Sequence, residues 1–149
     1  MTLPDPIDEP ALYEGVRSRR LAAFCLDLMV ILVLLGGVAI IAVIVNVLTF
    51  GLALPFTVPA FAVIGLIYRT TMVMERSATL GMMAFGIELR DGEGVRLTAG
   101  LALVHAGLYT AALYMTPIQA ISLLYCLFNP RKQMLHDVVA GTVMIRRPA

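Results

Sequence analysis

The position of the charged residues constrains this chain more than any other feature of its sequence. Residues 28–68 contain no Asp, Glu, Lys or Arg, and residues 97–130 contain none either. All 11 basic and 10 acidic side chains lie outside these two runs. An apolar run of about 18 residues or more is typical of a membrane-spanning segment. The pattern excludes a soluble globular enzyme, and the net charge of +1 offers no electrostatic footprint for nucleic acid.

The first uncharged run predicts two membrane-spanning helices. Asn, Gly and Pro residues cluster between positions 46 and 59, where they mark a turn. Residues 21–48 would form a helix about 42 Å long, and residues 56–74 a second helix. Each would cross the hydrocarbon core of a bilayer, which is about 30 Å thick. Gly36 and Gly37 are expected to permit close helix packing.

The segment before the first helix is unlike a cleaved signal peptide, because it is acidic and because the apolar run that follows is too long. Its first ten residues include three prolines. We therefore expect residues 1–15 to be a disordered N-terminal tail and residues 16–149 to form one multi-pass membrane domain.

The second uncharged run allows two interpretations. It can form one long tilted span, or a helical hairpin with arms at residues 99–115 and 117–128, broken at Thr116-Pro117. Three segments are rich in basic residues: three precede the first helix, four lie between the two runs and four follow the second run. The first connection has none. Basic segments favour the cytoplasmic side, which requires an even number of crossings and favours the hairpin. Three spans remain the alternative.

Short elements are expected between and after the two runs. Residues 75–86 suit a short interfacial helix. Residues 87–97 alternate apolar and charged side chains around an Asp91-Gly92 turn, which predicts a β-hairpin. The β-branched segment 142–145 would add a third strand, because two strands alone are marginally stable. The expected fold class is an all-α membrane protein: a bundle of about four membrane-embedded helices, with two full spans and a short helical hairpin, and a small cytoplasmic β-hairpin or three-stranded element.

Asp27 is the polar residue that most needs an explanation. It lies about two turns inside the first helix, where a charged side chain costs roughly 2.5–3.5 kcal/mol on insertion scales. Arg20 is seven residues earlier and shares its helix face. The Cα atoms are about 10 Å apart, so we expect Arg20 to approach Asp27, directly or through a water.

The C-terminal charged segment predicts a second polar site. Residues 131–141 carry an apolar stripe typical of a short amphipathic helix on the membrane surface. Asp137 flanks this stripe and should reach the cytoplasmic end of the first helix, where Arg20 lies. Neighbouring side chains on a helix diverge by about 100°, so His136 and Asp137 are not expected to form a metal-binding pair. His105, inside the second run, is a secondary candidate together with His136.

These residues resemble the RDD family of bacterial membrane proteins. Arg20 and Asp27, followed by the segment His136-Asp137-x-x-Ala140-Gly141-Thr142, match the arginine and two aspartates for which that family is named. The segment from Thr79-x-Gly81 to Asp91-Gly92 is similar to a family stretch of the form T-P-G-K…G-(I/L)-x-V-x-D-x-x-G. Leu80, Met82 and His105 depart from the family pattern, which often has Pro, Lys and a basic residue there.

Two functions follow from these observations. The resemblance implies transport, and the residues allow a cation/proton-coupling site at Arg20, Asp27 and Asp137, because burial and a nearby arginine shift a carboxyl pKa in opposite directions. The alternative is a non-catalytic accessory or assembly protein, in which Arg20 clamps the two aspartates.

Neither reading involves an enzyme, a cofactor or a metal ion, because no nucleophile–base pair, phosphate loop or ligand set is visible. Expected partners are the lipid bilayer and a second copy or another membrane protein, with no nucleic acid. We expect the bacterial inner membrane, with both termini cytoplasmic.

Overall fold

A computed structural model describes residues 6–147. These residues form a short 3-10 helix, six α-helices and two strands. Their order along the chain is η1 (Pro10–Leu12), α1 (Val16–Leu48), α2 (Leu54–Arg76), α3 (Leu80–Ala84), β1 (Ile87–Arg90), α4 (Ala99–Tyr114), α5 (Thr116–Phe128), α6 (Leu135–Val139) and β2 (Val143–Arg146). The fold class expected from the sequence is confirmed in its helical bundle and small β element.

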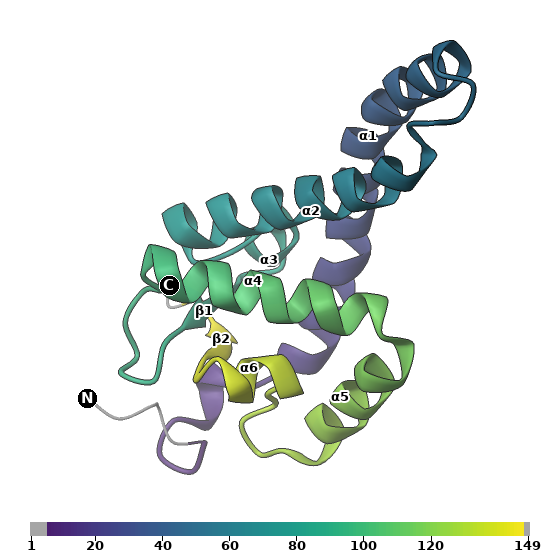
Figure 1. The fold of residues 1–149 in the computed structure, drawn as a ribbon. Coiled ribbons are helices and arrows are strands. Elements are labelled where there is room, and N and C mark those ends of the chain that lie inside the picture. The colour runs from purple at the N-terminus through teal and green to yellow at the C-terminus, as the bar shows by residue number, and fades with distance from the viewer. Residues whose placement is uncertain (1–5, 148–149) are drawn as a thin grey trace.

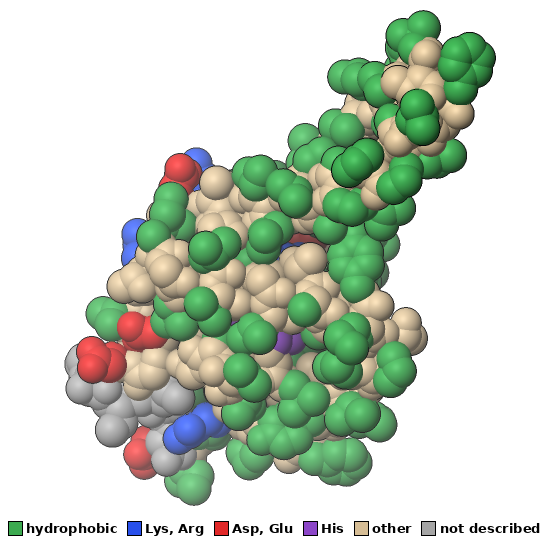
Figure 2. Space-filling view, in the orientation of Figure 1, with side chains coloured by type: hydrophobic (Ala, Val, Ile, Leu, Met, Phe, Trp, Pro, Cys, Tyr) green, Lys and Arg blue, Asp and Glu red, His purple; other side chains and the backbone are tan. Residues whose placement is uncertain are grey.

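Helices α1 and α2 form a long antiparallel hairpin whose tip projects beyond the rest of the molecule (Figure 1). Both are long and apolar enough to cross a membrane. The chain turns at Phe50 and Gly51, which have positive φ values, and Pro55 lies in the first turn of α2, where its missing N–H costs nothing. Apolar side chains cover this hairpin in the space-filling view (Figure 2). A Cβ at Gly36 or Gly37 would meet nothing within 4 Å, so the close packing expected there is absent.

Helices α4 and α5 meet at a bend of 114°. Met115 leaves helical geometry, and Pro117 lies in the first turn of the new helix. At about 24 Å and 20 Å, each helix is shorter than a hydrocarbon core. Arg17 donates to the carbonyl oxygens of Cys126 (3.3 Å) and Leu127 (2.6 Å), which places the end of α5 beside the start of α1. This return agrees with the helical hairpin expected from the basic residues.

The sheet differs from the expected three strands. β1 pairs antiparallel with β2, Leu89 opposite Met144, so the C-terminal strand joins this segment as predicted. The second arm of the predicted hairpin is not a strand: the Asp91 carboxylate accepts hydrogen bonds from the backbone N–H groups of Glu93 and Val95, and the chain then enters α4. The other edge of β1 is occupied as well, since Leu89 N–H donates to the carbonyl of Ser77.

The buried core lies at one end of the bundle, where α1, α2, β1 and α4 meet. Val16, Val73, Ile87 and Ala102 are completely buried there. The N-terminal segment also packs at this end: Tyr13 is buried against Val143 and Ile145. Within the tail that was expected to be disordered, Tyr13 is therefore packed and Pro10–Leu12 are helical, because Tyr13 supplies an apolar contact; residues 1–5 lie outside the described residues. The polar side chains described next lie on the elements of this bundle.

Candidate functional site

A buried ion pair joins the start of α1 to α6. Arg20 Nη1 lies 2.6 Å from Asp137 Oδ2, and Asp137 is completely buried. The same oxygen accepts a hydrogen bond from Met134 N–H, which closes the first turn of α6. Asp137 Oδ1 has no hydrogen-bond partner among the described residues. The predicted contact between Arg20 and Asp137 is therefore confirmed, and half of the carboxylate remains available.

Both histidines face the free oxygen of Asp137. His136 Nε2 lies 3.4 Å from Oδ1 and His105 Nδ1 lies 3.7 Å from it. His105 Nδ1 also shares a hydrogen bond of 3.1 Å with Thr142 Oγ1. We call Arg20, His105, His136 and Asp137 the Asp137 cluster. The side chains of His136 and Asp137 were expected to point apart, and this is wrong: His136 Nε2 and Asp137 Oδ1 are close together. Both side chains turn into the protein from a helix of a single turn.

Burial and charge act on the two α6 residues in different directions. For Asp137, burial by itself would raise the pKa, but the Arg20 guanidinium and the neighbouring histidines outweigh it and lower the pKa from 3.8 to about 2. For His136, burial lowers the pKa below 6.5, and the Asp137 charge offsets this only in part. At neutral pH the cluster therefore holds an ionised aspartate and a neutral His136.

Asp27 has hydrogen-bond partners of its own. Its Oδ2 accepts a hydrogen bond of 2.5 Å from Thr79 Oγ1, and its Oδ1 accepts bonds from Gly81 N–H (2.9 Å) and Tyr68 Oη (3.0 Å). Thr79 is the N-cap of α3 and also accepts from Met82 N–H. No ion pair joins Arg20 to Asp27 within residues 6–147, so the expected bridge between two carboxylates is wrong. Arg20 reaches toward α6, whereas Asp27 fastens α1 to α2 and α3.

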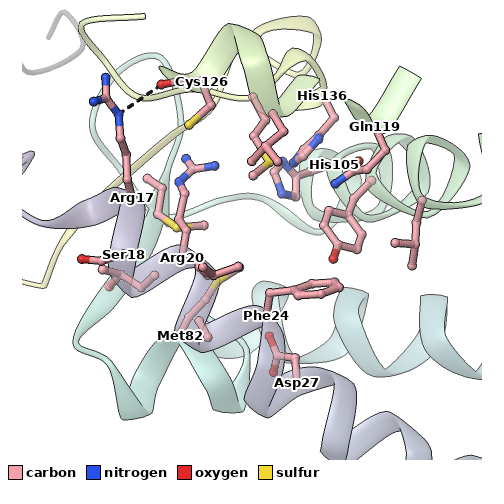
Figure 3. A pocket seen from close by; sticks show the side chains of 18 of the residues that line it. Arg17, Ser18, Arg20, Phe24, Asp27, Met82, His105, Gln119, Cys126 and His136 are labelled. Atoms are coloured by element: carbon pink, nitrogen blue, oxygen red, sulfur yellow. Dashed lines mark hydrogen bonds between the residues drawn. The ribbon is translucent and has the colours of Figure 1, made fainter. Parts of the chain in front are cut away.

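A cavity of about 510 Å³ lies between α1 and the helices that carry the histidines. Arg20, His105 and His136 point into it from different elements, with Phe24 on the opposite side (Figure 3). Apolar side chains make up most of the remaining lining, among them Leu21, Leu123 and Leu127. The space-filling view shows histidine surface at the bottom of a hollow between such side chains (Figure 2). The lining of the cavity is therefore largely apolar and contains a few charged or polar side chains, Asp27 among them.

Arg69 also lines this cavity and was not singled out from the sequence. It lies in α2, is only 5% exposed, and stacks 3.7 Å above the ring of Tyr109. Tyr109 in turn makes an edge contact with His136, with ring centroids 5.2 Å apart. The sequence analysis used Arg69 only as one of the basic residues that indicate which segments are cytoplasmic. The available signal was its position directly after an uncharged run, which places it at the edge of the membrane.

The histidines and Asp137 also have the composition of a metal site. Ligand atoms of His105, His136 and Asp137 all lie within 4.8 Å of one another. Neutral histidine and carboxylate are ligands of several transition metals. However, Arg20 already neutralises the carboxylate, and Arg69 adds a second positive charge nearby, which influences His136. Like charges therefore oppose a cation at this position.

The comparisons with known proteins assign the family. The model of the RDD family matches residues 15–141, which is most of the chain. Comparisons with curated proteins and with solved structures gave no match. The family match includes Arg20, Asp27 and Asp137, the residues on which the resemblance was recognised. The apolar helices agree with this assignment, because RDD proteins are membrane proteins. The chain belongs to the RDD family.

Proposed function

We propose that the protein is a small proton-coupled membrane transporter whose coupling site is the Asp137 cluster. The observation that carries this proposal is the free oxygen of Asp137, which faces His105 and His136, two buried histidines that line a cavity of about 510 Å³. Exposed to water, an imidazole takes up a proton near pH 6.5. Burial of His136 favours the release of that proton. A conformation that opens and closes the cavity would therefore bind and release a proton once per cycle.

The site that we propose differs from the one expected in the sequence. The three hydrogen bonds to Asp27 come from α2 and the α3 segment and fasten these elements to α1, so we assign Asp27 a structural role. The proposal keeps the proton coupling that was expected from the sequence. The positive charges of Arg20 and Arg69 argue against a bound metal cation. The proposal includes no enzymatic reaction.

The proposed setting is the bacterial inner membrane, with both termini on the cytoplasmic side. The distribution of basic residues supports this orientation. The pairing of β1 with β2 supports a common side for the middle and C-terminal segments. Exposed apolar side chains in the second half of α1, such as Ile40 and Val47, would contact lipid, a second copy of the chain or another membrane protein.

Proton flux into proteoliposomes tests the proposal. Vesicles with an internal pH dye are given a pH gradient, with sodium, potassium or no added ion gradient. We expect a protein-dependent pH change that His136→Gln abolishes, because glutamine retains polar groups but does not titrate. Val139→Ala, on the exposed face of the same helix, serves as the control and should transport normally.

A second candidate function is a non-catalytic accessory or assembly protein. It is favoured by the number of polar contacts that join helices, namely those of Arg17, Arg20 and Asp27. It predicts no flux above protein-free vesicles for the folded wild-type protein. Asp27→Asn would then reduce only the yield of folded protein. The absence of flux would contradict the transport proposal, whereas the effect of Asp27→Asn is expected under both functions.

A further inference from the structure

Two arginines in the cavity have hydrogen-bond donors without acceptors. Arg20 is bound through Nη1 alone, and its Nε and Nη2 are buried with no partner among the described residues. Arg69 forms no hydrogen bond or ion pair within residues 6–147, and its contact is the stacking on Tyr109. Buried polar groups in proteins are normally hydrogen-bonded, and buried charges are normally paired. These two guanidinium groups therefore lack acceptors in the geometry of the described residues.

The carboxylates of the chain do not supply these acceptors. Asp27 lines the cavity, but among the described residues its oxygens accept hydrogen bonds from Tyr68, Thr79 and Gly81 and from neither arginine. Asp137 Oδ2 is occupied by Arg20 and Met134, which leaves Oδ1 alone. A guanidinium group presents several N–H donors in a planar fork, and this fork matches the oxygens of a phosphate or carboxylate. An anion with several oxygens would supply the acceptors that these guanidinium groups lack.

The depth of the two arginines matches a lipid headgroup. Arg20 lies about 6 Å from the start of α1, and Arg69 about 10 Å from the end of α2. These two helix ends lie at the same end of the bundle (Figure 1). The same cavity is also lined by Leu21, Leu123 and Leu127, which are between 50% and 66% exposed. In a membrane such side chains contact acyl chains, so the cavity joins a charged interior to a lipid-facing rim.

We propose that this cavity binds an amphiphile with a phosphate headgroup. Arg20 and Arg69 hold the phosphate, and Gln119 and the histidines lie around it. The apolar residues at the rim of the cavity hold the acyl chains of the amphiphile. Gln119 fits this role because its side chain points into the cavity (Figure 3), and the NH₂ group of its amide can donate to a phosphate oxygen. The inference deepens the proposed function, on which it rests for the idea that the ligand is transported. Binding itself is measured without transport.

Binding is tested on delipidated protein in neutral detergent, by native mass spectrometry and by thermal unfolding. The probes are dioctanoyl phosphatidic acid, dioctanoylglycerol and inorganic phosphate. We expect one phosphatidic acid per chain and a raised melting temperature, with much weaker effects from the other two. Arg69→Gln should weaken binding roughly tenfold to a hundredfold, since it removes charge-assisted hydrogen bonds. Arg76→Gln, at an exposed arginine of the same helix, should bind normally.

A second variant separates binding from a purely structural role. Arg69→Met removes a buried, unpaired charge, so it should raise the melting temperature of the ligand-free protein while it abolishes the shift with phosphatidic acid. A lower melting temperature without ligand would contradict the inference.

Other outcomes would overturn it as well. Equal binding of dioctanoylglycerol would indicate an apolar occupant, and equal binding of inorganic phosphate would indicate a free anion site. Absence of binding by all three probes would leave water as the occupant. Specific lipid binding without proton flux would support the inference and contradict only the proposed function; flux without lipid binding would do the reverse.

Discussion

At the scale of single residues, the partner of each charge decides its role. Arg20 and Asp27 share a helix face, yet Arg20 bonds to Asp137, which is 117 positions away in the chain. Asp27 bonds to Thr79 and Gly81 of the α3 segment. The sequence identified all three family residues as important. It could not pair them, because the pairing depends on how α3 and α6 pack against α1.

Gly81 shows how tightly Asp27 is held. A Cβ at this position would lie 2.2 Å from the Ala23 carbonyl oxygen and 2.9 Å from Asp27 Cγ. Backbone atoms cannot move aside, so Gly81→Ala should force α3 away from α1. We expect it to lower the free energy of unfolding by about 1–3 kcal/mol, the usual cost of overpacking.

Thermal unfolding in detergent measures this effect. The control is Gly65→Ala in α2, where a Cβ meets nothing within 4 Å. Because alanine favours helix more than glycine does, the control should be unchanged or up to about 1 kcal/mol more stable. If Gly81→Ala melts at the wild-type temperature, the close approach of α3 to α1 is not required for stability.

At the scale of elements, local patterns located the helices well. The predicted arms at 99–115 and 117–128 correspond to α4 and α5, because Thr116-Pro117 is a strong local signal. The predicted β-hairpin failed, although its alternation and its Asp91-Gly92 turn were correct local signs. The second edge of β1 is taken by Ser77, a residue from the end of α2. A tertiary contact thus replaced the expected local strand pairing.

The return of α5 predicts the side on which the chain ends. Because the last carbonyl groups of α5 bond to Arg17 at the start of α1, the C-terminus should lie on the same side as the N-terminus. A C-terminal green fluorescent protein fusion should therefore fluoresce, and a C-terminal alkaline phosphatase fusion should be inactive. Phosphatase inserted between α1 and α2 is the control and should be active. An active C-terminal phosphatase would indicate an odd number of crossings.

At the scale of the whole molecule, stability should depend on pH through the Asp137 cluster. The pKa of His136 is lowered in the folded protein, so its contribution to stability is full above pH 6.5 and is lost as the pH falls below that value. The pKa of Asp137 is lowered from 3.8 to about 2, so its contribution is lost as the pH falls between those values. Both effects act in the same direction.

We therefore expect the melting temperature to fall between pH 7 and pH 5 and to fall further below pH 4. His136→Gln should reduce the slope of the first part, because glutamine does not titrate. Val139→Ala should retain the wild-type slope, although it lies on the same helix. A melting temperature that does not change between pH 7 and pH 5 would show that His136 is not held neutral by burial.

The sequence by itself determined the membrane class, the approximate limits of the four long helices and the three family residues. These properties follow from local patterns: uncharged runs, helix-breaking residues and fixed spacing along one helix. Only the tertiary structure decided that Asp27 and Asp137 have different partners, that Arg69 enters the cavity, and that both histidines face one carboxylate oxygen. Each of these depends on distant segments that meet at the packed end of the bundle, where buried charges must find partners or bind a ligand that supplies them.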